Sequence, residues 1–393
     1  MNRLLRSTVT HAMHGIHMLG IHKVLARRWG GRGIILMLHR VQPAPAVRTA
    51  FAPNAHLSIT PDFLATTIGH IRQSGFDIVS LDEAIERLRG GSRRKFAVLT
   101  LDDGYRDNLE HAYGVFRALD APFTIYVPSS WPSGGGELWW RVLEDVIAAN
   151  DEIEPGVSGL PDVVETVTGS QKLRLFVQIN KRLNTMSETS QRMVVRDLAA
   201  RYGVDLADLC RAEIMSWDEL RQLSRDKLAT IGAHTISHPQ LTKLSDAALD
   251  AELLHARLEI ERQLGLPCRH LAYPYGDSRS VGKREHEAAR RAGFRSAVTT
   301  TNSPIYERHG DCLFSLPRVA IDGDRQTLWA LDVQASGVVP ALRAGFARLA
   351  LGKSREPSVG RRGAVPAAER VLSLQPPGKG NKSRRTTHGR IGT

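Results

Sequence analysis

The sequence is poor in cysteine and has no long apolar run, and each absence excludes a class of protein. The three cysteines, Cys210, Cys268 and Cys312, stand at no metal-binding or redox spacing, so we expect no disulfide framework. No stretch reaches the roughly 18 apolar residues of a membrane span. The basic N-terminus lacks a small-residue cleavage site, so we do not expect a secretory signal. A reducing, cytoplasmic compartment fits these absences.

The net charge of +12 is concentrated at the two ends of the chain. Residues 1–32 carry six basic side chains and no acidic one, and residues 353–393 carry ten basic and two acidic ones. The long stretch between them is therefore close to neutral. Because a protein that reads nucleic acid carries basic residues on its folded body, we expect no nucleic-acid partner.

The N-terminal segment, residues 1–32, shows apolar residues at helical spacing. This pattern predicts an amphipathic helix over residues 3–28 with a basic, histidine-rich polar side. Two interpretations stay open. The helix packs on the body of the protein, or it lies on an anionic membrane surface and gives the protein a peripheral contact with the inner membrane.

Short apolar runs alternate with helical patterns between residues 33 and 335. Runs such as Gly33–His39 and Pro122–Pro128 read as buried strands, and a last strand is expected from Leu313 to Ile321. Strands that alternate with helices predict a parallel sheet with helical crossovers, the α/β class.

Residues 129–213 break this rhythm and predict a helical insertion at a strand end. The insertion begins with Trp131, Trp139 and Trp140, and polar helices are expected over about 139–149, 171–184 and 187–201. The tryptophans either pack in a core or offer flat faces to sugar rings. After the barrel we expect a C-terminal helix over 336–351 and a basic, disordered tail over 352–393.

A buried strand ends on two adjacent carboxylates, Asp102 and Asp103, and Gly104 then permits an abrupt turn. Such carboxylates cost desolvation energy unless a metal, a proton or a role as base compensates. Adjacent strand residues point to opposite sides, so the two share one site only if the strand ends at about Leu101. The alternative is a turn in which Asp103 caps the next helix.

His234 and His238 form a second cluster, four residues apart. The segment follows a strand and precedes Pro239, so we expect a strand-end loop or one tight turn. Two histidines and one carboxylate are a hydrolytic zinc set that leaves positions for water and substrate. Such a metal lowers the pKa of its bound water to roughly 7 and polarises a carbonyl.

Three stretches together resemble the signatures of the polysaccharide deacetylases, carbohydrate esterase family 4: Thr100–Tyr105, His234–His238 and Tyr273–Gly276. The resemblance spans about residues 33–325 and implies a distorted (β/α) barrel of about seven strands. It implies that Asp102 is the catalytic base and that Asp103, His234 and His238 hold a divalent metal, most consistent with Zn²⁺.

The activity implied by the resemblance is removal of N-acetyl groups from oligo- or polysaccharides, with release of acetate. The chain is most similar to the variant found with bacterial exopolysaccharide synthesis. An N-acetylated saccharide is then the expected partner. Two other functions stay open: a metal amidase on a non-sugar substrate, and a carbohydrate-binding or assembly protein without catalysis.

The chain departs from the family pattern at two places. The third motif usually carries an arginine two residues before Pro274, where this chain has Ala272. Near the C-terminal strand, Leu316–Val319 replaces the usual Leu-x-His of the general acid. His39, at the end of the first core strand, is therefore a candidate proton donor, unless it is only a hydrogen-bonded histidine in the barrel mouth.

Substrate contacts are expected from aromatic, proline and arginine side chains near the motifs. A backbone N–H near Tyr275 is the expected donor to the oxyanion. The predicted substrate-binding residues are Tyr105, Tyr273, Pro274, Tyr275, Trp139, Trp140 and Arg318.

Overall fold

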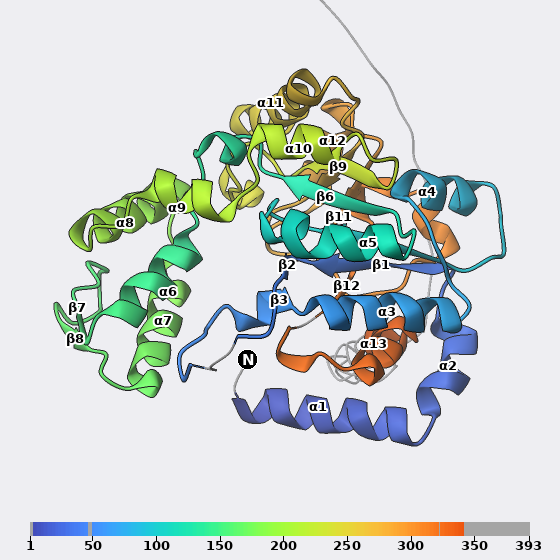
Figure 1. Ribbon diagram of the computed structural model, residues 1–393, viewed down its shortest axis with the longest axis horizontal. Helices are drawn as coiled ribbons and strands as arrows, with labels where there is room; N and C mark the ends of the chain where they lie inside the picture. The colour runs from blue at the N-terminus through green and yellow to red at the C-terminus, as the bar shows by residue number, and fades with distance from the viewer. Residues whose placement is uncertain (1–2, 46–48, 322, 342–393) are drawn as a thin grey trace, which may run out of the picture. The chain divides into compact units, whose positions relative to one another are not determined.

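The computed structural model describes residues 3–45, 49–321 and 323–341. Its centre is a parallel sheet with the strand order β11, β10, β9, β6, β5, β1, β12, and β4 lies beside β5 (Figure 1). The strands of this sheet are β1 (Gly33–Leu38), β4 (Asp77–Ile78), β5 (Phe96–Leu101), β6 (Phe123–Val127), β9 (Ala229–Ala233), β10 (His270–Ala272), β11 (Ser296–Val298) and β12 (Val319–Ala320).

One short segment, residues 316–320, connects the two outer strands of this sheet. Leu316 forms a parallel bridge with Val298 of β11, and three residues later Val319 pairs with Leu36 of β1. The strands therefore curve round into a distorted barrel. This confirms the α/β barrel of about seven strands that the sequence predicted.

The two central strands are apolar along their whole length, as expected for parallel strands covered on both faces. All six residues of β5 are buried, and so are five of the six residues of β1. The barrel is surrounded by helices α3 (Pro61–Gln73), α4 (Leu81–Arg89), α5 (Tyr113–Ala118), α10 (Trp217–Leu223), α11 (Asp246–Leu264), α12 (Lys283–Arg291) and α13 (Leu328–Ala335). A separate parallel pair joins β2 (Arg40–Val41) to β3 (Ser58–Ile59).

The expected insertion follows the carboxyl end of β6 and builds an apolar core of its own, away from the barrel core (Figure 1). Its last helix, α9, was not predicted from the sequence. The elements are α6 (Trp139–Ala149), β7 (Glu152–Ile153), β8 (Val164–Glu165), α7 (Gly169–Leu183), α8 (Glu188–Arg201) and α9 (Leu206–Glu213).

The N-terminal segment forms two helices where the sequence analysis expected one. α1 (Arg3–Met18) and α2 (Ile21–Trp29) are separated at Gly20, whose φ of 65° lies in the left-handed region. α1 packs on α13, where the ring of His14 meets Trp329 edge-on with 5.1 Å between ring centres. The interpretation that the N-terminal segment packs on the body of the protein is thus correct for the face of α1 that meets α13. None of the described helices is both long and apolar enough to cross a membrane.

The structure near the C-terminus differs in part from the sequence prediction. The expected strand Leu313–Ile321 is wrong for its first half, because Leu313–Ser315 is a 3₁₀ turn and only Val319–Ala320 pairs as a strand. Residues 338–341 are helical, as expected for the segment 336–351. The remainder of that helix and the tail 352–393 lie outside the described residues.

The separate core of the insertion makes a prediction about stability. Ile179 is fully buried in that core, so Ile179→Ala leaves a cavity and should lower the free energy of unfolding by about 2–5 kcal/mol. Met193→Ala, on the exposed side of α8, is the control and should change it by less than about 0.5 kcal/mol. Thermal and denaturant melting measure both. An unchanged stability in Ile179→Ala would show that the insertion contributes no cooperative core.

Candidate active site

The two adjacent aspartates lie at the carboxyl end of β5, where the chain leaves the barrel. β5 ends at Leu101, and the Asp102 N–H still donates to the carbonyl of Leu38 at 2.9 Å. Asp103 and Gly104 then take φ values of 73° and 68°. A non-glycine residue in this region stores backbone strain, which is typical of functional sites. The turn brings both carboxylates to one site.

Asp102 is held by a buried arginine from the segment that closes the barrel. Nη1 and Nη2 of Arg318 donate to the two carboxylate oxygens of Asp102, each at 2.7 Å. The same guanidinium donates from Nε to the carbonyl of Thr299 at 3.0 Å. Burial alone would raise the pKa of Asp102, but the charge and hydrogen bonds of Arg318 outweigh it and lower that pKa below its ordinary value.

Arg318 was predicted to bind substrate, but the structure gives it a different position. Its side chain is completely buried behind Asp102, so the expected contact with substrate is wrong. The side chain positions the carboxylate instead. The third motif has Ala272 where its usual arginine would stand, and here an arginine reaches the aspartate from the segment that closes the barrel between β11 and β1.

Asp103 has no such partner, although it is equally buried. Its Oδ1 lies 3.6 Å from Nε2 of His234 and 3.5 Å from Nε2 of His238. Within the described part of the chain no hydrogen bond reaches that oxygen. Burial and the neighbouring charge of Asp102 raise the pKa of Asp103 well above its usual value. The alternative role of Asp103 as a helix cap is wrong, because no side-chain cap bond is present at the following helical turn.

The two histidines project from a loop directly after β9, as the sequence analysis expected. Thr235 and His238 both have positive φ, at 66° and 59°. Glu252 of α11 holds this loop by accepting hydrogen bonds from the backbone N–H groups of Ile236 and Ser237, at 2.8 and 3.1 Å. The loop is therefore rigidly tied to the barrel helix beneath it.

The histidines are arranged and protonated as metal ligands are. The Nδ1 of His234 lies 2.7 Å from the carbonyl oxygen of Ala272, which leaves Nε2 facing Asp103. Burial lowers the pKa of His234, and burial together with His234 lowers that of His238 well below its usual value. Both rings are thus neutral at pH 7. An unpaired buried carboxylate oxygen beside two neutral imidazole nitrogens fits a divalent cation.

A cavity of about 750 Å³ opens over these residues and has room for a saccharide unit. His39, Asp102, Asp103, His234 and His238 all line it. Of the predicted substrate contacts, the cavity lining includes Trp139, Trp140, Tyr273 and Tyr275.

The predicted substrate contacts of Tyr105 and Pro274 are wrong, because both side chains are buried away from the cavity. Tyr105 accepts a hydrogen bond from Nε1 of Trp140 at 3.0 Å, and the guanidinium of Arg40 stacks 4.5 Å from its ring centre. It supports the wall of the site from behind and cannot touch a substrate.

The expected proton donor, His39, half-buried at the end of β1, faces the cavity. Burial lowers its pKa to about 4, although the charge of Asp102 opposes the shift. The ring is therefore neutral at pH 7 in the free protein. A role as acid requires that it first gains a proton.

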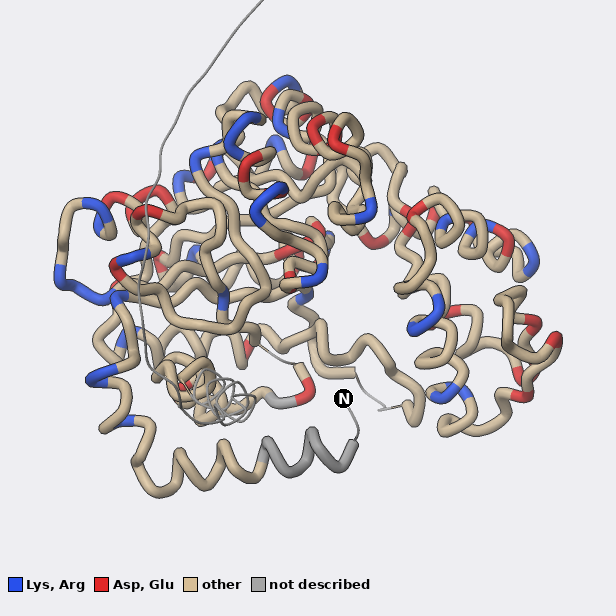
Figure 2. The backbone as a smooth tube through the Cα atoms, turned by 180° about the vertical axis from the view of Figure 1, so that it is seen from behind, with Lys and Arg blue, Asp and Glu red and all other residues tan. Residues whose placement is uncertain are grey.

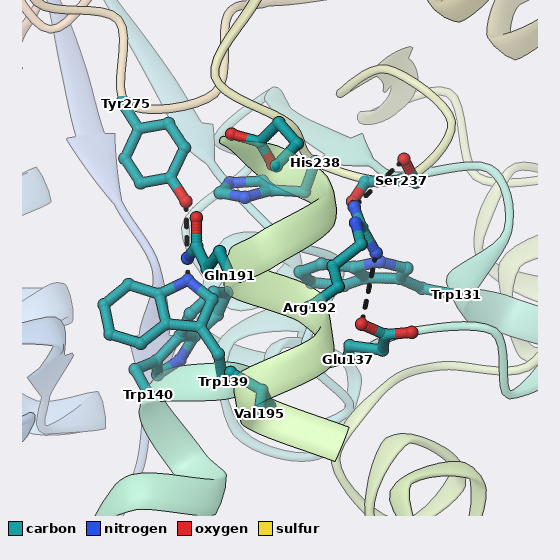
Figure 3. Close-up of a pocket in the computed structure, with 11 residues that line it drawn as sticks. Trp131, Glu137, Trp139, Trp140, Gln191, Arg192, Val195, Ser237, His238 and Tyr275 are labelled. Carbon is teal, nitrogen blue, oxygen red and sulfur yellow. Dashed lines mark hydrogen bonds and ion pairs between the residues drawn. The ribbon is translucent and has the colours of Figure 1, made fainter. Parts of the chain in front are cut away.

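The tryptophans divide between the two interpretations that the sequence left open. Trp131 and Trp140 are buried against His238, with ring centres 5.4 and 5.6 Å from its imidazole. The space among them is only about 20 Å³, too small for a sugar ring (Figure 3). Trp139 is half-buried, lines the large cavity, and donates from Nε1 to the hydroxyl of Tyr275 at 3.4 Å. Of the two tryptophans that line the large cavity, Trp139 is the more exposed and is the better placed to contact a sugar.

Helix α8 of the insertion reaches the histidine loop and ties it in place. Arg192 donates to the carbonyl of Ser237 at 2.8 Å and pairs with Glu137 at 3.4 Å, as Figure 3 shows. The N–H of Gln240, just beyond the loop, donates to Glu188 at 3.1 Å. The insertion thus helps to position His238.

Sequence analysis missed one whole wall of the cavity, which comes from α7. Its contributions stand at the spacing of one helix face, which was the available signal. Two of them, Leu173 and Val177, are 44% and 55% exposed. The missed lining residues are Ala52, Pro53, Asn54, His56, Leu57, Leu173, Phe176, Val177, Asn180, Thr300 and Asp324.

Comparison with solved structures gives deacetylases of low sequence identity. The Streptococcus pyogenes deacetylase PplD in complex with acetate is 18% identical, with 74% of this chain and 92% of that chain covered and a TM-score of 0.49. IcaB from Ammonifex degensii is 19% identical, with 78% and 98% covered and a TM-score of 0.47. A de-N-acetylase from Aggregatibacter actinomycetemcomitans is 16% identical, with 77% and 99% covered and a TM-score of 0.48.

No curated protein matches this chain significantly in sequence. The family model of the polysaccharide deacetylases matches residues 89–297, which is more than half of the chain. The matched stretch includes Asp102, Asp103, His234 and His238. On this match, the chain belongs to the polysaccharide deacetylase family.

Proposed function

We propose that this protein removes N-acetyl groups from an N-acetylated oligo- or polysaccharide of the exopolysaccharide or chito-oligosaccharide type, and that it needs a divalent metal, zinc by its ligands. As a family member the chain is a hydrolase of N-acetyl carbon–nitrogen bonds. The observation that carries the finer proposal is the pairing of two unlike buried carboxylates at one cavity. Asp102 is paired with Arg318, whereas Oδ1 of Asp103 lies beside the Nε2 atoms of His234 and His238 and accepts no hydrogen bond within the described residues.

The residues divide the chemistry between them. Asp103, His234 and His238 would hold the metal, which when bound polarises the acetyl carbonyl and makes water more acidic. Asp102 accepts the proton of the attacking water, because Arg318 keeps its carboxylate ionised at neutral pH. The N–H near Tyr275 is the proposed donor to the oxyanion.

The proton then has to reach the leaving amine, so that the amide carbon–nitrogen bond breaks and acetate departs. His39 lines the same cavity and is neutral at pH 7, so it can take up a proton during the reaction and pass it on. Trp139 and the α7 wall would bind the sugar by packing against its C–H faces.

A first prediction separates the roles of the two aspartates. Asp103→Asn should lose bound metal, because a neutral amide oxygen is a poorer ligand than a carboxylate. Asp102→Asn should keep its metal and lose turnover by about 10²–10⁴-fold, the usual contribution of a general base. Elemental analysis and acetate release from N-acetylated oligosaccharides measure the two effects, with and without added zinc.

Excess zinc should restore part of the activity of Asp103→Asn and none of that of Asp102→Asn. Metal loss in Asp102→Asn with full retention in Asp103→Asn would reverse the assignment. Acetate release from small non-sugar amides but not from oligosaccharides would favour the amidase. Tight saccharide binding without acetate release by the metal-loaded wild type would favour the non-catalytic binding protein.

A second prediction concerns the arginine that holds the base. In Arg318→Gln burial is no longer compensated, so the pKa of Asp102 should rise and the base should be protonated at a higher pH. The acid limb of the pH–rate profile should therefore move to higher pH. Removing the partner of a buried charge also costs about 3–5 kcal/mol of stability.

Two variants accompany this measurement. Arg318→Lys keeps the charge and should show a smaller shift of the acid limb. Arg279→Gln removes an arginine that is 86% exposed and should leave the profile unchanged. A folded Arg318→Gln protein with the acid limb of the wild type would show that Arg318 does not set the ionisation of Asp102.

We also propose that the protein acts at the surface of the inner membrane. In the segment between residues 18 and 24, where α1 turns into α2, exposed apolar side chains stand beside the exposed Lys23. Leu19 is 76% exposed and Val24 is 69% exposed. α2 carries the basic residues Lys23, Arg27 and Arg28, and its tube shows no acidic position (Figure 2). This combination supports binding to an anionic bilayer.

A third prediction tests that contact. The full-length protein should sediment with vesicles that contain anionic phosphatidylglycerol and stay in solution with purely zwitterionic vesicles. Leu19→Glu should weaken sedimentation, because it places a charge in the apolar contact. Leu266→Glu, at an apolar site on the barrel that is 48% exposed, is the matched control and should sediment like the wild type. Equal sedimentation of both variants would contradict the contact.

A further inference from the structure

A second group of histidine and carboxylate side chains, the types that can ligate a metal, lies outside the large cavity, among four helices. His17 comes from α1, His22 from α2, His70 from α3 and Asp332 from α13. We call these four residues the helix cluster. None of them lines the large cavity over the catalytic residues. The proposed deacetylation makes no use of the cluster.

Three members of the helix cluster are close enough together to hold one metal ion. His17, His22 and Asp332 each offer a ligand atom, and these atoms all lie within 4.8 Å of one another. Asp103, His234 and His238 satisfy the same criterion in the catalytic site. Two imidazoles and a carboxylate again make up a zinc-type set.

The carboxylate of Asp332 is placed to serve two partners at once. Its Oδ1 lies 2.6 Å from Nε2 of His70, a hydrogen bond that fixes the orientation of the carboxylate. Its Oδ2 lies 3.3 Å from Nε2 of His17 and is directed to the remaining histidines. This division resembles a metal-bound carboxylate whose second oxygen is held by an outer hydrogen-bond donor.

His22 is the most buried member, with 5% of its surface exposed. Its Nδ1 lies 3.5 Å from the carbonyl oxygen of Ile16, so Nε2 remains for an ion. The catalytic His234 has the same arrangement, with Nδ1 at a backbone carbonyl. The rings of His17 and His22 are stacked at 4.5 Å and 14°, so one of them must turn about its side-chain bonds for both nitrogens to face one ion.

We propose that His17, His22 and Asp332 bind a second divalent metal ion, with zinc as the preferred ion, and that His70 orients Asp332 for it. The ion fastens α1 and α2 to α13 and α3, elements that are far apart in the sequence. Its role is structural, because all three of its ligands come from helices outside the cavity. An ion that binds the folded form and not the unfolded form adds to the stability of these contacts.

The test counts zinc in the full-length protein after chelation, reloading with zinc and removal of the excess. His22→Gln and His17→Gln should each contain one equivalent less than the wild type. His255→Gln removes an exposed histidine of α11 and should keep the full content. Asp103→Asn should lose the other equivalent, and the combined variant Asp103→Asn with His22→Gln should lose both. Each variant is compared with the wild type for its number of zinc equivalents. If the catalytic site bound no zinc, the loss of one equivalent from the helix cluster would still be seen.

Two further measurements guard against a variant that fails to fold. Asp332→Asn preserves the shape of the side chain and should also lose one equivalent while circular dichroism matches the wild type. Zinc should raise the melting temperature of Asp103→Asn, and this rise should vanish in the combined variant. Equal zinc contents in folded His17→Gln, His22→Gln, Asp332→Asn and His255→Gln would overturn the proposal and show a hydrogen-bonded cluster without an ion.

Discussion

The buried ion pair between Arg318 and Asp102 is the constraint on which the site depends. Two carboxylates in sequence cannot both stay ionised in a buried place unless each has its own compensation. Arg318 compensates Asp102 through two hydrogen bonds of 2.7 Å. Asp103 has no such partner, and its Oδ1 lies between the Nε2 atoms of His234 and His238. The ion pair thus gives the two neighbouring carboxyl groups opposite pKa shifts, which is what the proposed roles of base and metal ligand require.

The same ion pair depends on how the barrel closes. Arg318 belongs to the short segment that pairs with β11 at Leu316 and with β1 at Val319. Its side chain points from that closure to the end of β5. Any change that opens the barrel at this place would also remove the partner of Asp102. Closure of the fold and ionisation of Asp102 are therefore coupled through one side chain.

The insertion has two tasks that its position after β6 makes possible. Its helix α8 holds the histidine loop through Arg192 and Ser237, while α7 supplies an exposed apolar wall to the cavity. Glu252 of α11 accepts hydrogen bonds from two backbone N–H groups of the same loop. The loop that carries His238 in a strained backbone conformation is therefore tied both to the insertion and to a barrel helix.

The residues of the chain alone determined the α/β class, the turn after Leu101 and the two clusters that hold the aspartates and the histidines. Each of these follows from local chemistry: apolar runs, a glycine after two carboxylates, and histidines at a strand end. The barrel and the choice of Asp103 over Asp102 as the carboxylate ligand came from the resemblance to the deacetylase signatures. Three-dimensional structure alone decided that Arg318 holds Asp102 and that Tyr105 is a support, because both facts depend on contacts between segments far apart in the sequence. Likewise, only the packing of four helices brings His17, His22, His70 and Asp332 together, since no spacing within one segment predicts it.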